Sequence, residues 1–188
     1  MAIKLNVIIG STRPGRIGLP IGKWFYETVS KDARFASTLV DLAEVNLPVF
    51  DEPKHPLMQD YQHEHTKKWS TIVQSADAYV FVTPEYDYFP PASLINAITY
   101  LSKEWQYKAA GLVSYGGVSG GLRSAQALKL MLTAVKIMPL PEGVPIPFGG
   151  KQIHDGVFKS NELIDLSVKN MLDELAKWSG ALAPLQAK

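Results

Sequence analysis

A loop near the amino terminus contains the residue types that bind a phosphate group. Residues 10–18 read GSTRPGRIG and directly follow a short apolar run. The hydroxyl groups of Ser11 and Thr12, the guanidinium of Arg13 and the backbone N–H groups of a helix beginning here would all donate hydrogen bonds to a dianionic phosphomonoester. The spacing is neither GxGxxG nor GxxxxGK[ST], so it predicts neither a Rossmann dinucleotide site nor a P-loop. Turn glycines and solvated arginines are the alternative interpretation.

Two later segments could complete a ligand site. Residues 83–91, TPEYDYFPP, combine two tyrosines and a phenylalanine with rigid prolines, and such flat aromatic surface can form a slot for a planar ring. Residues 114–121, SYGGVSGG, contain four glycines, which let the backbone approach a ligand and offer its amides as donors. Each segment alone could equally be a surface turn or a group of packing aromatics.

One pattern suggests a different enzyme class. Residues 117–121, GVSGG, match the GxSxG of a serine hydrolase between an expected strand and helix. Beyond Ser119 the chain offers only His154, and only Glu142 lies between them, in a Pro-rich stretch. Because no HGGG-like oxyanion segment is present either, a serine hydrolase is kept as the lesser alternative.

The histidines offer a weaker signal. His55, His63 and His65 could suggest a metal site. His63 and His65 fall in a helical pattern, however, and side chains two residues apart on a helix do not face each other. Surface histidines are therefore expected, and no metal site is predicted.

Composition narrows the class of protein. The 188 residues are 46% hydrophobic and 20% charged, which fits one globular domain and excludes a disordered or fibrous chain. A net charge of +1 gives no sign of a nucleic-acid-binding surface. Cysteine is absent, which removes disulfides and thiolate chemistry and favours a reducing cytoplasm. No apolar run approaches the roughly 18 residues of a membrane span, so neither membrane nor targeting segment is expected.

Short apolar runs alternate with 3.6-residue patterns, which is typical of strands alternating with helices in a parallel sheet. Strands are expected at 3–9, 38–42, 79–83, 109–114 and 136–138, and helices around 21–29, 65–76, 94–105, 122–135 and 164–175. Asp60 is expected to cap the second helix, Gly180 to end the last one, and residues 139–147 to form a surface connection.

These elements predict a three-layer α/β sandwich, a single domain over residues 1–188, with five parallel strands in the order 2-1-3-4-5. Ligands in such sheets bind at the carboxyl ends of the strands. The three glycine-rich or aromatic segments follow strands one, three and four, which are neighbours in this order. A phosphate on the first segment and a planar ring between the other two together describe one flavin mononucleotide, FMN.

In these motifs the chain resembles the NAD(P)H-dependent FMN reductase family, which includes flavodoxin-like quinone, azo-dye and chromate reductases. Residues 10–13 match its GSxR loop, 84–87 its PEYN segment and 94–98 its LKNAI helix start, while 103–105 and 114–117 are similar to the fungal quinone reductases of the group. The motifs in this order span most of the chain. The resemblance implies that FMN is bound by Ser11, Arg13, Arg16, Ile17, Gly18, Pro84, Glu85, Tyr86, Asp87, Tyr88, Ser114, Tyr115, Gly116 and Gly117.

The resemblance also implies a reaction and partners. FMN would accept a hydride from NAD(P)H and pass two electrons to a small-molecule acceptor in a ping-pong cycle, so few catalytic side chains are needed. The acceptors implied are quinones, azo compounds or free flavin. A flavodoxin-like homodimer in the cytoplasm is expected, with its sites near the interface.

Two departures from the family pattern bear on the site. Asp87 stands where the family has Asn, and Phe89 where it has a small or flexible residue; Ile95 and Thr99 depart further along. Asp87 would add a like charge near the phosphate or the ribityl chain, and Phe89 would narrow the substrate slot. These departures favour the other alternative, a flavodoxin-like binding protein with little or no turnover.

Overall fold

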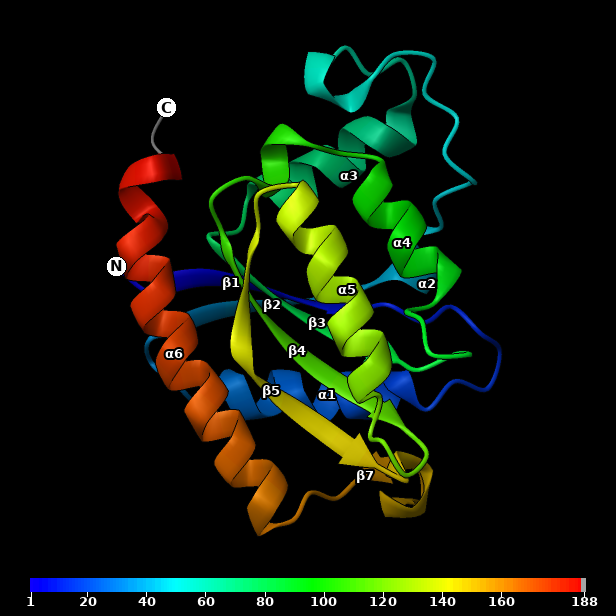
Figure 1. The fold of residues 1–188 in the computed structure, drawn as a ribbon, viewed down its shortest axis with the longest axis vertical. Helices are drawn as coiled ribbons and strands as arrows, with labels where there is room; N and C mark the ends of the chain where they lie inside the picture. Colours follow the sequence, from blue (N-terminus) through cyan, green and yellow to red (C-terminus); the bar gives the residue numbers. More distant parts are fainter. Residues whose placement is uncertain (187–188) are drawn as a thin grey trace.

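The protein is described here for residues 1–186 by a computed structural model, in which a five-stranded parallel sheet has the order β2-β1-β3-β4-β5 (Figure 1). The strands are β1 (Ile3–Ile9), β2 (Phe35–Asp41), β3 (Ala78–Pro84), β4 (Ala109–Gly116) and β5 (Met138–Pro147). All seven residues of the central β3 are buried, as its nearly continuous apolar sequence requires. The predicted flavodoxin-like architecture is confirmed.

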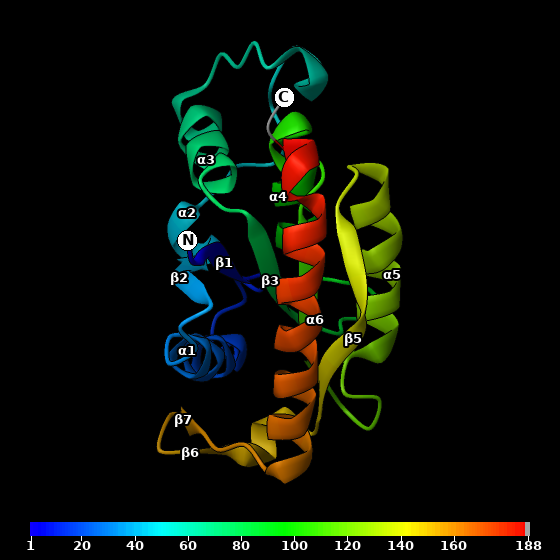
Figure 2. The ribbon, with the colours of Figure 1, turned by 90° about the vertical axis from the view of Figure 1, so that its left-hand side faces the viewer.

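Helices cover both faces of this sheet (Figure 2). One face packs against α1 (Gly18–Val29) and the long α6 (Glu162–Gln186). The other packs against α2 (Leu42–Val45), α3 (Glu64–Gln74), α4 (Ala92–Thr99) and α5 (Leu122–Ala134). The remaining elements are three 3₁₀ turns, η1 (Pro56–Met58), η2 (Lys103–Trp105) and η3 (Gly149–Gln152), and a small hairpin of β6 (Ile153–His154) and β7 (Val157–Phe158).

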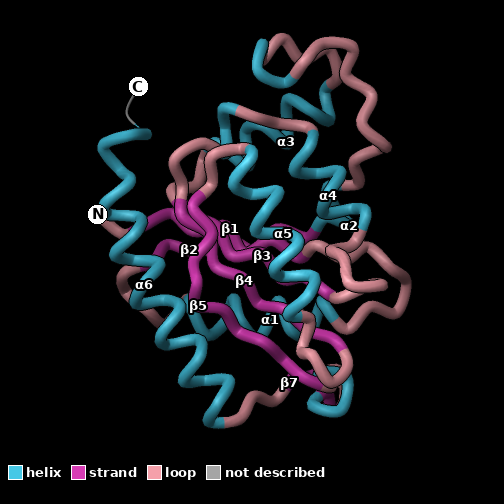
Figure 3. The backbone as a smooth tube through the Cα atoms, in the orientation of Figure 1, coloured by secondary structure: helices cyan, strands magenta, loops and turns pink. Residues whose placement is uncertain are grey.

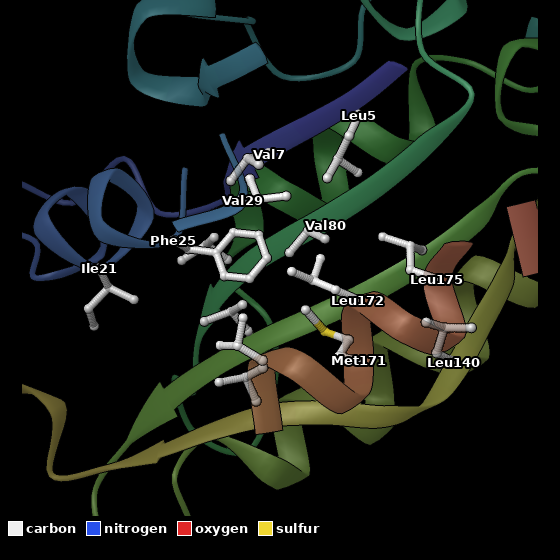
Figure 4. Packing of buried hydrophobic residues seen from close by; sticks show 14 of the residues in the cluster. Leu5, Val7, Ile21, Phe25, Val29, Val80, Leu140, Met171, Leu172 and Leu175 are labelled. Carbon is white, nitrogen blue, oxygen red and sulfur yellow. The ribbon is translucent and has the colours of Figure 1, made fainter. Parts of the chain in front are cut away.

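The core between the sheet and the α1–α6 layer holds α1 in a fixed position. Phe25 of α1, Val80 of β3 and Met171 of α6 are all fully buried in this cluster (Figure 4). Burying each such side chain contributes about 1.5–3 kcal/mol before entropy is counted. The amino terminus of α1 is thereby fixed at the carboxyl edge of the sheet, beside the loop that follows β1.

A fifth strand was predicted and is present as β5, but the prediction for residues 139–147 was wrong. The stretch expected as a surface connection is β5 itself, which pairs with β4 along nearly its whole length. Proline is compatible with this position because β5 is an edge strand, where a missing N–H can face solvent. Leu140, Val144 and Ile146 are fully buried and provide the driving force. The four prolines made this otherwise largely apolar strand look like a loop in the sequence.

Three helix boundaries also differ from prediction. The residue at the N-cap of α3 is His63, not Asp60. The third helix ends at Thr99, and Trp105 lies in the separate turn η2. Helix α6 continues through Gly180 to Gln186, because Leu182 packs on the core and Gln186 Nε2 donates to the Tyr107 carbonyl at 2.9 Å. These contacts outweigh the roughly 1 kcal/mol that a helical glycine costs.

Three loops leave the carboxyl ends of β1, β3 and β4 on the same side of the molecule (Figure 3). They cover residues 10–17, 85–91 and 117–121. The sheet order makes their strands direct neighbours, as predicted. Among residues 1–186, no helix combines the length and apolarity needed to cross a bilayer.

Candidate functional site

The loop after β1 is built on a tight turn. The Arg16 N–H donates to the Arg13 carbonyl at 3.1 Å, and Gly15 between them has φ of +69°. Proline second and a left-handed glycine third are typical of a type II turn. The loop leads into α1, whose N-cap residue Ile17 makes no side-chain capping bond and whose first turn holds no acidic residue. The first N–H groups of α1 are thus available to an anion.

The two arginines of this loop are placed differently. Arg16 forms an ion pair with Asp41 at the end of β2, and only 17% of its side chain is exposed. Asp41 Oδ1 also accepts the Ala43 N–H at 3.0 Å, which caps α2. Arg13, in contrast, is exposed. Arg16 therefore fastens the loop to β2, whereas Arg13 remains available to a ligand.

Beneath the loop, three hydroxyl groups gather. Ser11 is fully buried, and its Oγ shares a hydrogen bond of 2.9 Å with Tyr86 Oη from the β3 loop. The Tyr115 side chain runs under α1, where a Cβ added at Gly18 would lie 2.3 Å from its hydroxyl oxygen. A side chain at position 18 would therefore force the Tyr115 ring to move. Burial, together with the nearby Tyr86, raises the pKa of Tyr115.

The loop after β3 contains a two-residue reversal. Tyr86 and Phe89 exchange two backbone hydrogen bonds of 2.9 Å each, while Asp87 and Tyr88 between them have φ of +49° and +74°. This is the pattern of a type I′ turn, which favours Asn, Asp or Gly at its first central position. Asp87 therefore keeps the geometry that the family's Asn would have. It is exposed, and so is Phe89.

Glu85 connects this loop to the one after β4. Only 7% of its side chain is exposed, and its carboxylate accepts hydrogen bonds from Ser119 Oγ at 3.1 Å and from Arg123 Nε at 2.7 Å. The Arg123 backbone N–H in the first turn of α5 adds a third bond at 3.1 Å. Burial acts to raise the pKa of Glu85, but these donors prevail and hold that pKa below its ordinary value.

The glycine-rich loop after β4 contains glycines with different roles. Gly121 has φ of +81°, and a Cβ there would lie 2.6 Å from the Tyr115 nitrogen, so the fold requires glycine. A Cβ at Gly117 would meet nothing within 4 Å. Ser114 Oγ donates to the Gly120 carbonyl at 2.9 Å, which holds the loop closed. The open space beside Gly117 is where a ligand could approach the backbone.

The structure thus brings the predicted residues of all three loops to one edge of the sheet. Pro84, whose carbonyl accepts a hydrogen bond from Ser124 Oγ at 2.7 Å, and Gly116, where an added Cβ would lie 3.4 Å from Glu85 Cβ, complete the links between β3, β4 and α5. Sequence reasoning missed Asp41 and Arg123. No motif marks either residue, since each acts on a partner far away along the chain.

The surroundings of Ser119 do not support a serine hydrolase. Its hydroxyl donates to Glu85 and accepts from Arg123 Nη2 at 3.1 Å. A nucleophilic serine needs a neighbouring base such as histidine to take its proton. The GxSxG pattern here is part of a Gly-rich helix start.

The expectation that His63 and His65 do not face each other was wrong. Their rings stack with centroids 5.1 Å apart, because His63 precedes α3 in extended conformation and helical spacing does not apply to it. His65 Nε2 lies 2.9 Å from Asp51 Oδ1. Within residues 1–186, no group of three or more His, Asp or Glu side chains is arranged to hold a metal ion.

Comparison with known proteins agrees with this geometry. The family model of the NADPH-dependent FMN reductases matches residues 3–151. The chain belongs to this family. It is 37% identical over 156 residues to an NAD(P)H-dependent FMN reductase of Schizosaccharomyces pombe, a match that covers 82% of this chain and 78% of the relative. An NADPH azoreductase of a Bacillus species is 30% identical over 158 residues, covering 82% and 81%.

Solved structures agree on the fold. The flavoenzyme NAD(P)H:(acceptor) oxidoreductase FerB of Paracoccus denitrificans superimposes with a TM-score of 0.76 at 20% identity, over 96% of this chain and 98% of that one. The predicted family, the oxidoreductase class and the FMN and NAD(P)H cofactors of that class are confirmed. Family membership does not favour a binding protein without turnover.

Proposed function

We propose that this FMN reductase family member transfers two electrons from NAD(P)H to quinones or azo compounds, with free flavin as a further acceptor. The proposal rests on two side-chain contacts that hold the three loops next to one another. Ser11 with Tyr86 joins the β1 and β3 loops, and Glu85 with Ser119 joins the β3 and β4 loops. One ligand the length of FMN would contact all three.

The first loop is suited to the phosphate of FMN. The uncapped amino terminus of α1, at Ile17 and Gly18, would present N–H donors, and the exposed Arg13 would add a charged fork. The Tyr115 hydroxyl is buried without a hydrogen-bond partner in the described part of the chain. A buried, unpaired donor beneath an open helix terminus fits an anion held nearby. Arg16 would position the loop through Asp41.

The other two loops are suited to the ring. The open space beside Gly117 would admit its edge. In the Pro84–Tyr88 loop, the N–H groups of Glu85 and Tyr86 already donate to backbone carbonyls, so those of Asp87 and Tyr88 would stabilise negative charge developing at the pyrimidine side of the ring. Ser114 and Gly116 would shape the slot from below. FMN, when bound, supplies the hydride and two-electron chemistry, and the chain's own groups bind and orient it.

The same proposal includes the domain organisation, the oligomeric state and the location of the enzyme. We propose that residues 1–188 act as one FMN-binding domain, that the protein forms a homodimer and that it works in the cytoplasm. The long connection from α2 to α3 exposes Val49, Leu57 and Met58, apolar surface that a second copy could cover. Analytical ultracentrifugation tests the dimer, and cell fractionation tests the location.

The deciding experiment is an anaerobic titration of the purified protein with FMN and then NAD(P)H. A yellow complex that bleaches on addition of the nicotinamide and recovers its colour with a quinone is expected. A protein that neither quenches FMN fluorescence nor shows a flavin spectrum would contradict the proposal. FAD should bind less well than FMN, since nothing beyond residues 11–18 suits an adenylate.

A further inference from the structure

Tyr88 adopts a backbone conformation that its own side chain disfavours. Its φ of +74° lies in the left-handed region, which bulky residues rarely enter and which glycine enters freely. The reciprocal bonds between Tyr86 and Phe89 fix the turn whatever residue stands at this position. The fold alone would therefore favour glycine, so the tyrosine ring has a use that the fold does not explain.

The ring of Tyr88 is covered by an arginine. The Cζ atom of Arg123 lies 4.0 Å from the ring centroid, a close cation–π contact, although 60% of Tyr88 is exposed. Arg123 comes from α5, so the contact joins two loops at the candidate site. We call this pair the Tyr88–Arg123 shelf.

The Arg123 side chain is fixed by hydrogen bonds, although it is partly exposed to solvent. Its Nε bonds to Glu85 Oε1 at 2.7 Å and its Nη2 to Ser119 Oγ at 3.1 Å, while 47% of its side chain remains exposed. The Glu85 side chain is itself held in one position, because it is almost completely buried. A guanidinium with restricted rotamers loses little entropy when it binds a second anion, which favours directional recognition.

The segments that form the shelf expose several apolar side chains in addition to the charged Asp87. Phe89, Val118 and Leu122 are all exposed there, on the same two loops and the start of α5. A cationic fork on an apolar rim suits a ligand that is flat and apolar at one end and anionic at the other.

This inference rests on the proposed function: we infer that the Tyr88–Arg123 shelf recognises an anionic oxygen group on a substrate whose planar ring binds over the cofactor. The group could belong to the acceptor, as a sulfonate or carboxylate, or to the nicotinamide donor, as the 2′-phosphate of NADPH. Arg123 is a specificity-determining residue in either case.

The test compares paired substrates that differ by one anion. The acceptor pair is 1,4-naphthoquinone and its 2-sulfonate, and the donor pair is NADH and NADPH. The preference for the anionic member of a pair is measured as the ratio of the two kcat/KM values. In Arg123→Met, this ratio should fall about 10-fold in one of the two pairs. This is the low end of the effect expected for a charge-assisted hydrogen bond to a half-exposed side chain. The pair that changes identifies the source of the anion.

Two further variants distinguish a loss of substrate preference from a loss of folding. Arg123→Lys keeps a charge beside the buried Glu85, and it should lose part of the preference because lysine lacks the planar fork. Tyr88→Gly relieves the backbone strain, so the thermal midpoint should stay level or rise while the preference still falls. A structural role alone would lower the midpoint and leave the preference intact.

Arg34→Met is the matched control. Arg34 is also ion-paired, with Asp32 and Asp173, lies over an aromatic ring at Phe35 and has 43% of its side chain exposed, but it stands at the opposite end of the sheet. Its preference ratios should match those of the wild type. Unchanged ratios in both Arg123 variants would overturn the shelf, whereas a wild-type chain that binds no FMN would overturn the proposed function and the shelf with it.

Discussion

Arg13 and Arg16 stand three residues apart in one loop and have different surroundings. Both look like phosphate ligands in the sequence. Arg16 turns back to Asp41, which lies 25 positions further along the chain, and Arg13 faces solvent. Composition and spacing predict a basic loop correctly, but the choice between its arginines depends on a partner that only the folded sheet brings near.

Arg13→Ala should weaken FMN binding by about 1.5–3 kcal/mol, the usual contribution of a hydrogen bond to a charged group. Riboflavin, which lacks the phosphate, should bind almost as before. Fluorescence titration with both ligands measures the difference. The matched variant Arg16→Ala should affect both ligands together, because it frees the whole loop; equal losses in Arg13→Ala would show that Arg13 holds the fold instead.

At the scale of elements, the loop after β4 gives a second contrast. Gly117 and Gly121 belong to one glycine-rich segment, and the sequence treats them alike. In the fold, only Gly121 has a left-handed backbone and a crowded Cβ direction, while Gly117 faces open space. The motif therefore combines a structural requirement with a candidate binding surface.

Gly121→Ala should destabilise the protein by at least about 1–2 kcal/mol, from the left-handed backbone alone. Gly117→Ala should change the free energy of unfolding by no more than about 0.5 kcal/mol but weaken FMN about tenfold. Denaturant unfolding and FMN titration of both variants check this. A Gly117→Ala protein with normal FMN affinity would place the ring elsewhere.

The far end of the sheet contains a buried lysine that joins β4 to α3. Lys108 Nζ donates to the carbonyls of Val73 at 3.1 Å and Gln74 at 3.4 Å, at the carboxyl end of α3, and to Tyr79 Oη at 3.0 Å. Burial lowers its pKa from 10.5 to about 8. Between about pH 8 and 10.5 the unfolded chain therefore holds a proton that the folded chain lacks.

It follows that Lys108 makes the free energy of unfolding rise as the pH increases from about 8 to 10.5. Lys108→Met should remove this rise. Urea unfolding at several pH values in this range, for wild type and variant, measures the difference between them. Lys23→Met, on the exposed side of α1, is the control and should keep the wild-type slope; a slope unchanged in Lys108→Met would contradict the prediction.

Element boundaries were predictable where local patterns dominate. Short apolar runs located β1, β3 and β4, and the 3.6-residue pattern located the middle of each long helix. The prediction failed over residues 139–147 of β5, where burial of alternate residues overrides the prolines, and at Gly180, where contacts of Leu182 and Gln186 extend α6. In both places tertiary packing outweighs the local signal.

At the scale of the whole molecule, the sheet order brings the ligand loops together. The order 2-1-3-4-5 follows from right-handed crossovers and was predictable without any contact information. The pairing of Glu85 with Arg123 was not, since it needs the actual approach of two loops. Ligand binding at such a junction should couple to the stability of the entire fold.

FMN at 100 times its dissociation constant should therefore raise the free energy of unfolding by about 2.7 kcal/mol. The thermal midpoint should rise with FMN concentration, and riboflavin at an equal multiple of its own dissociation constant should give the same shift. Differential scanning fluorimetry over a range of ligand concentrations measures this. A midpoint independent of FMN would mean that the folded state does not bind it.

The prolines of β5 have a consequence for behaviour at high concentration. Pro139 and Pro141, and again Pro145 and Pro147, are two residues apart on an edge strand, where each removes an amide that another chain could bind. An incoming strand would find few donors along this border. Fibrous aggregation by strand addition is thus blocked there, and the growth of such aggregates would have to start from β2 at the opposite border of the sheet.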